Sequence, residues 1–91
     1  MSENEALPQI DFATFILSLS HSALVNLGEA PDPDTQKVSI SLPIAKQNID
    51  LLGLLEEKTK GNLSGDEERL LAQVLFDLRM RYVEKSKTAS K

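Results

Sequence analysis

The single histidine of the chain, His21, is the first candidate for chemistry, because imidazole is the commonest general base in proteins. Ser18 lies one helical turn before it, at a spacing that suits a nucleophile–base pair. Such a pair also needs a group that orients the imidazole, and no acidic residue of the surrounding run is placed to do so. One histidine and no cysteine leave no ligand set for zinc. We therefore expect His21 to be structural rather than catalytic, and no metal site is predicted.

A small acidic cluster, Glu29, Asp32 and Asp34, lies in a stretch broken by two prolines. It fails the calcium-loop pattern, because Gln36 and Lys37 stand where that loop needs a ligand and a glycine. The glycines are scattered and form no phosphate-binding loop. We interpret the cluster as a solvated turn, and no cofactor is expected.

The one basic concentration lies near the C-terminus and includes Arg79, Arg81 and Lys85. Positive charge near the end of a helix offsets the helix dipole, which explains these residues without a ligand. They are also candidate phosphate contacts. This leaves open a second reading, a nucleic-acid-associated accessory protein. The formal net charge of −4 disfavours it, because phosphate neutralisation supplies most non-specific affinity for nucleic acid.

These residues are positioned by three predicted helices, over about residues 12–27, 43–60 and 65–85. The predicted ends are marked by residues that favour helix termini: Asp11, Gly28, Pro43, Gly61 and the Ser64–Glu67 capping box. The short connection between the second and third helices predicts an antiparallel helical hairpin.

The fold class is therefore all-α, a helical hairpin plus an N-terminal helix, with an extended segment between helices one and two. That segment, Val38–Leu42, alternates apolar and polar residues like a strand but has no second strand to pair with. It either lies against the helices or pairs with its own copy across a dimer. A single helical domain is expected over residues 11–85, between a disordered arm at 1–10 and a disordered tail at 86–91.

The third helix carries two apolar stripes. The expected core stripe is Leu70, Leu71, Val74, Leu75, Leu78 and Tyr82. The second stripe consists of Ala72, Phe76, Met80 and Val83. A lone exposed apolar residue needs no explanation, but an aligned row predicts an interface.

The first helix contains no charged residue from Phe12 to Leu27, although 26% of the chain is charged. Its expected core arc is Phe12, Phe15, Ile16, Leu19, Ala23 and Leu27, widened by Leu17 and Leu24. Opposite this arc lie Thr14, Ser18 and Ser22, small residues one turn apart that permit close helix packing. A helix buried on both sides predicts a homodimeric bundle that assembles through helices one and three.

On the second helix Asn48 falls within a broad apolar face. The expected face is Ile44, Ala45, Ile49, Leu51, Leu52 and Leu55. Asn48 is either a core asparagine satisfied by a neighbour or a device that fixes helix register or oligomeric state.

Three segments resemble a small bacterial family, the domain of unknown function 1844: Ala23–Pro33, Gly53–Leu63 and Leu78–Val83. The similarity covers about residues 11–84. It implies a bacterial, cytoplasmic protein, and it brings no activity, substrate or catalytic residue.

The favoured function is a non-enzymatic interaction module that forms a homodimer, and an unidentified protein partner stays open. Besides the nucleic-acid reading, a weaker alternative is a small-ligand binder at a dimer seam around His21, Asn48 and residues 29–34. The apolar run of the first helix is too short and too polar for a membrane span, and the acidic N-terminus is unlike a signal peptide. We therefore expect a cytoplasmic protein.

Overall fold

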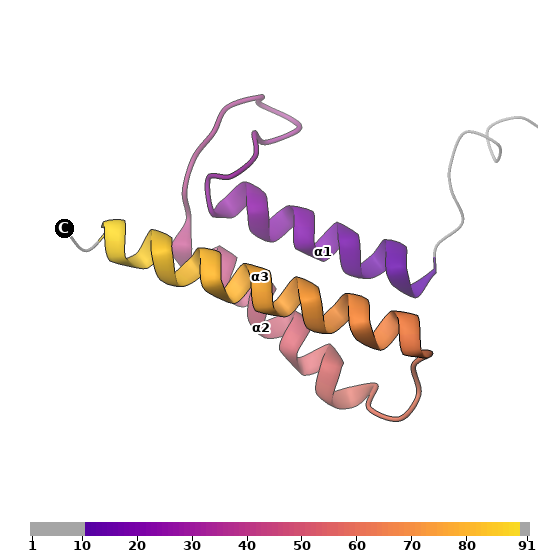
Figure 1. The fold of residues 1–91 in the computed structure, drawn as a ribbon. Coiled ribbons are helices and arrows are strands. Elements are labelled where there is room, and N and C mark those ends of the chain that lie inside the picture. The colour runs from indigo at the N-terminus through magenta and orange to yellow at the C-terminus, as the bar shows by residue number, and fades with distance from the viewer. Residues whose placement is uncertain (1–10, 90–91) are drawn as a thin grey trace, which may run out of the picture.

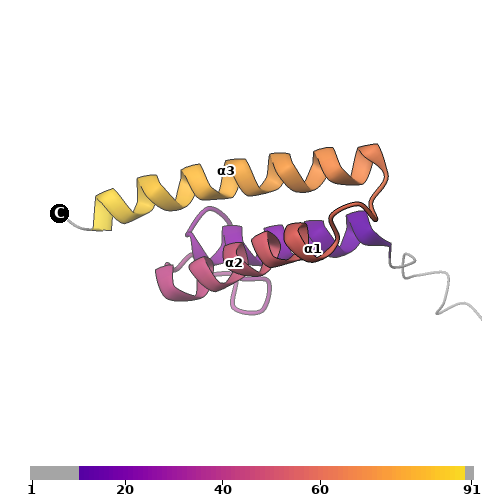
Figure 2. The same ribbon diagram turned by 90° about the horizontal axis from the view of Figure 1, so that it is seen from below.

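The computed structural model describes residues 11–89, which form three α-helices. They are α1 (Phe12–Asn26), α2 (Leu42–Lys58) and α3 (Gly65–Ala89). The helices α1 and α2 run antiparallel in one layer, and α3 lies across both in a second layer (Figures 1 and 2). All three pairs of helices are in contact, and residues 11–89 contain no strand. The predicted all-α class and the α2–α3 hairpin are confirmed.

The predicted N-terminal caps are present. The backbone N–H of Thr14 donates to Asp11 Oδ1 at 2.8 Å and so opens α1. At the start of α3, Glu67 N–H donates to Ser64 Oγ at 3.2 Å, and Ser64 N–H donates to Glu67 Oε1 at 2.9 Å. This reciprocal pair is the capping box predicted from the spacing of the two residues. Gly28 follows α1 with φ of +79°, the left-handed conformation that favours glycine after a helix.

The C-terminal ends of α2 and α3 differ from the expected positions. The second helix ends at Lys58, and Gly61 lies within the following turn with φ of +84°. The third helix continues to Ala89, past the predicted domain end at residue 85. Lysine and alanine are good helix formers, and the Thr88 hydroxyl donates to the Glu84 carbonyl at 3.1 Å. The predicted arm at 1–10 and the last two residues of the predicted tail lie outside the described residues.

The core is a single cluster to which every helix contributes. Its buried apolar members are Ile16, Ala23, Leu27, Ala45, Ile49, Leu52, Leu71, Leu75 and Leu78. The predicted core stripe of α3 is confirmed, since its remaining members Leu70, Val74 and Tyr82 are partly buried against this cluster.

Some residues predicted for the core are exposed instead. Phe15 and Leu17 of α1, and Ile44 and Leu51 of α2, have large exposed fractions. Two layers of helices bury only one arc of each helix, so the flanks of the broad predicted faces stay open. For the same reason α1 is not buried on both sides within one chain.

Asn48 is buried in the α1–α2 contact, where its Nδ2 donates to Ser22 Oγ at 3.2 Å. Within the described residues, no buried side-chain nitrogen or oxygen lacks a partner. Asn48 therefore has its partner inside the subunit, as the first of the two interpretations requires.

Ser22→Ala tests this contact, because it leaves the buried Asn48 amide without its acceptor. We expect the free energy of unfolding to fall by about 1–3 kcal/mol, measured by urea denaturation. Ser18 lies one turn away and is exposed, so Ser18→Ala is the matched control, with an expected change within about 0.5 kcal/mol. Equal effects of the two substitutions would show that the Asn48–Ser22 bond contributes nothing specific.

Candidate interaction surface

One side of α3 carries an exposed apolar row, which we call the α3 row: Ala72, Phe76, Met80 and Val83. Phe76 is 67% exposed, Met80 51% and Val83 50%. At 100° per residue these positions fall away from Leu71, Leu75 and Leu78, which are buried in the core. The predicted separation of α3 into a core stripe and a second stripe is thus present, and the second stripe is uncovered within the chain.

Charged residues border the α3 row on both flanks. Arg69 and Asp77 form ion pairs within α3, with Asp66 and with Arg81 respectively. Glu68 and Arg79 lie on the opposite flank about three turns apart, and neither has an ion-pair partner within residues 11–89. This flank therefore has one unpaired charge of each sign.

Arg79 passes close to α2 at Gly53. A Cβ atom added at Gly53 would lie 3.1 Å from the Arg79 guanidinium. The glycine thus leaves room for the arginine side chain beside the α2–α3 contact.

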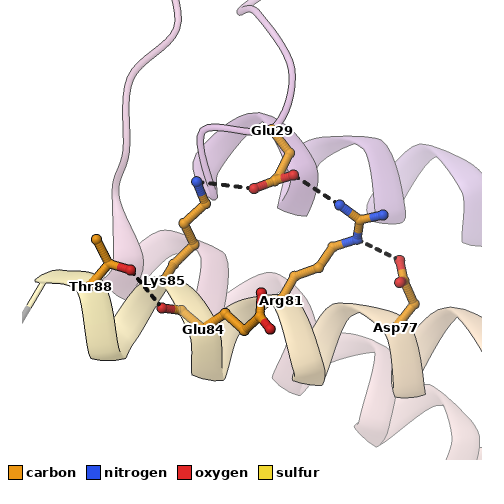
Figure 3. Close-up of polar contacts among 6 residues, drawn as sticks. All are labelled: Glu29, Asp77, Arg81, Glu84, Lys85 and Thr88. Atoms are coloured by element: carbon orange, nitrogen blue, oxygen red, sulfur yellow. Dashed lines mark hydrogen bonds and ion pairs between the residues drawn. The ribbon is translucent and has the colours of Figure 1, made fainter.

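A carboxylate from the α1–α2 connection is held by two cations of α3 (Figure 3). Glu29 Oε1 accepts from Arg81 at 2.9 Å, and Glu29 Oε2 lies 3.1 Å from Lys85 Nζ. Arg81 is also bonded to Asp77 at 2.8 Å, which fixes its direction. The hydrogen bond from Lys85, helped by the charge of Arg81, holds the pKa of Glu29 below its ordinary value against a smaller opposing effect of burial. We call this group the Glu29 clamp, and it ties the connection to the C-terminal half of α3.

The Glu29 clamp includes two of the predicted phosphate contacts, which were Arg79, Arg81 and Lys85. Two of the three, Arg81 and Lys85, already hold the Glu29 carboxylate, and Arg81 is also paired with Asp77. Phosphate would have to displace Glu29 from both cations. Phosphate binding here stays a prediction, and the geometry offers it no specific support.

The small residues of α1 have different surroundings. Ser18 is exposed, Thr14 is partly buried, and Ser22 faces α2 through its bond from Asn48. Ser22 is thus used inside the subunit, and the three do not form one open strip. Their predicted part in self-association stays a prediction.

The residues of the predicted seam site are also dispersed. His21 is exposed, Asn48 is buried, and Glu29 is held by α3. Asp32 closes the predicted turn, since its Oδ1 accepts the N–H groups of Asp34 at 2.7 Å and of Thr35 at 3.2 Å. A groove of about 680 Å³ lies between α2 and α3 near their connection and involves none of these residues. Its lining is Gly53, Glu56, Glu57, Lys60, Leu63, Glu68, Arg69, Leu71 and Ala72.

Sequence reasoning missed the Glu29 clamp. Glu29 and Arg81 are 52 positions apart, so neither periodicity nor local spacing links them. The only signal was the concentration of cations at the end of α3, which the helix dipole explained equally well.

A protein-family model described as "Domain of unknown function (DUF1844)" matches residues 9–84. No match was found among curated proteins or among solved structures. Among the described residues, no helix is long and apolar enough to cross a membrane.

The lowered pKa of Glu29 predicts a pH-dependent contribution of the clamp to stability. A carboxyl with a folded-state pKa below its unfolded value stabilises the fold above the unfolded pKa, and this contribution is lost as pH falls through the folded pKa. We therefore expect urea midpoints between about pH 7 and pH 3 to fall less in Glu29→Gln than in wild type.

Glu57→Gln is the matched control, because Glu57 is exposed and has no ion-pair partner within residues 11–89. It should keep the wild-type acid dependence. A carbon-13 titration of the Glu29 carboxyl that gave an ordinary or raised pKa would contradict the clamp directly.

Proposed function

The chain belongs to the family named Domain of unknown function (DUF1844), and we propose that it is a non-enzymatic module that self-associates through the α3 row. The observation that carries this proposal is the exposure of Phe76, Met80 and Val83 in one line on one helix. Covering a largely exposed phenylalanine contributes up to about 3 kcal/mol, a large part of the stability of a small domain. The row acts by burial of apolar surface, and it needs no catalytic group.

A second copy of the chain is the partner that the residues of α3 favour. Glu68 and Arg79 lie symmetrically, to within one residue, about the midpoint between Ala72 and Phe76. Two α3 helices packed antiparallel about that midpoint set Phe76 of each copy against the small Ala72 of the other. The same register sets Glu68 of each copy beside Arg79 of the other, because the two residues share one flank. In this register a large side chain packs against a small one and an acidic side chain lies beside a basic one. The surface is therefore self-complementary, as an isologous contact requires.

Phe76→Glu tests the contact, because it places a carboxylate at the centre of the proposed interface. Phe76 contributes little to the core of its own chain, so the variant should fold. By light scattering, we expect wild type to be a dimer at micromolar concentration and Phe76→Glu to be a monomer.

Leu54→Glu is the control, since Leu54 is half exposed on α2, away from the α3 row. It should leave the dimer unchanged. A monomeric wild type at all concentrations would refute the proposal, and so would a dimer that persists in Phe76→Glu.

The pairing of Glu68 with Arg79 is tested by charge exchange. Glu68→Arg and Arg79→Glu should each weaken the dimer roughly tenfold, because each places like charges together at two symmetric positions. The double variant Glu68→Arg/Arg79→Glu should recover most of the wild-type dissociation constant, measured by sedimentation equilibrium. Additive weakening in the double variant would exclude this register.

A further inference from the structure

The connection between α1 and α2 ends in an extended segment, residues 37–41, which runs from the turn to the start of α2 (Figure 1). Its two central apolar side chains are largely exposed, Val38 at 62% and Ile40 at 56%. The residue types of the segment alternate like those of a strand, but it has no neighbouring strand within residues 11–89.

One edge of the backbone of this segment makes hydrogen bonds at its two ends, and the other edge makes none within the described residues. The Lys37 carbonyl accepts from Asp32 N–H at 2.9 Å, and Ser41 N–H donates to the Asn26 carbonyl at 2.8 Å. In an extended chain the N–H and C=O groups of one residue point to the same edge, and those of the next residue point to the opposite edge. The Lys37 carbonyl and the Ser41 N–H point towards their own chain. The backbone N–H and C=O groups of Val38 and Ile40 therefore belong to the outward edge. Their N–H and C=O groups have no hydrogen-bond partner within the described residues.

The inner edge is held close to the end of α1. The Ser39 carbonyl lies 3.7 Å, and Ile40 Cγ1 2.6 Å, from the place that a Cβ atom would take at Gly28. Only a glycine leaves room for this approach, and Gly28 also has positive φ. The adjacent residue Glu29 is clamped by Arg81 and Lys85. The open edge is therefore presented by a segment that is fixed to the body of the protein.

We propose that residues 38–40 form an antiparallel strand pair with the same residues of a second copy of this chain. In the register that sets Ser39 opposite Ser39, Val38 of each copy faces Ile40 of the other. The four N–H groups and four carbonyls that point outward then combine into four hydrogen bonds. The Val38–Ile40 cross-strand pairs are β-branched, which suits sheet pairing. Lys37 faces Ser41, so no like charges oppose each other.

The segment also limits the contact to two copies. The reason is that its other edge faces its own chain, where the Lys37 carbonyl and the Ser41 N–H are bonded. The paired region also stays short, because Pro33 lies before the segment and Pro43 follows it in the first turn of α2. This contact uses different residues from the α3 row and does not depend on the proposed function.

Hydrogen exchange of the full chain, followed by NMR at about 20 µM and about 1 mM, tests the pairing. We expect the exchange of the Val38 and Ile40 amides to slow at least tenfold at the higher concentration, while Ser39 continues to exchange fast. An NOE between the Ser39 Hα protons of labelled and unlabelled copies would identify the register, because these protons approach across a non-hydrogen-bonded pair. Fast exchange of all three amides at both concentrations overturns the proposal.

Val38→Pro removes one outward N–H from each copy, whereas Val38→Thr keeps the N–H and the β-branched shape. Concentration-dependent protection of Ile40 should be lost in Val38→Pro and kept in Val38→Thr. If Val38→Pro fails to fold, the wild-type exchange pattern still decides.

The Phe76→Glu chain separates this contact from the α3 row. If Phe76→Glu is monomeric at micromolar concentration but keeps the alternating protection at about 1 mM, both contacts are supported. A dimer that survives Phe76→Glu but dissociates in Val38→Pro supports the strand pair and refutes the α3 contact. If Phe76→Glu is monomeric and the Val38 and Ile40 amides exchange fast in wild type, the strand pair alone is refuted.

Discussion

Burial of one leucine stripe of α3 across the α1–α2 layer is the constraint on which the rest of the structure depends. Leu71, Leu75 and Leu78 are buried in one cluster with residues of α1 and α2, and α3 lies over both of these helices (Figure 2). In a two-layer fold a helix buries about one arc of its surface, so apolar residues outside that arc are exposed. The exposed row of α3 follows from the way the core is made.

The Glu29 clamp is the second constraint, and it acts at long range. It joins the end of α1 to the C-terminal half of α3 and so determines where the α1–α2 connection lies (Figure 3). An exposed ion pair contributes little to stability by itself. Two cations on one carboxylate, with Arg81 also held by Asp77, hold a connection whose apolar residues Val38 and Ile40 are largely exposed. The open edge at Val38 and Ile40 is oriented as a result.

The two proposed contacts differ in physical character. The α3 row offers apolar area with complementary flanking charge, so its strength comes from surface removed from water. The extended segment offers backbone groups in a fixed register, so it gives geometric specificity with little area. Both are self-complementary about a twofold axis, which is the commonest symmetry of homo-oligomers.

Local patterns in the sequence determined the elements: the caps at Asp11 and Ser64, the turn at Gly28, and the division of α3 into two stripes. Each of these depends on residues within about one or two turns of one another, which is the range that periodicity and capping report. The sequence also left the partner of Asn48 open between a neighbour in the same chain and a second copy.

Only the tertiary structure decided which flanks of α1 and α2 are covered, so that Phe15 and Leu51 are exposed where the sequence predicted core. It alone paired Glu29 with Arg81, and it alone left one backbone edge of residues 37–41 open. These outcomes depend on the relative placement of helices and connections far apart in the chain. No local spacing encodes that placement, because it is set by how the three helices share a single core.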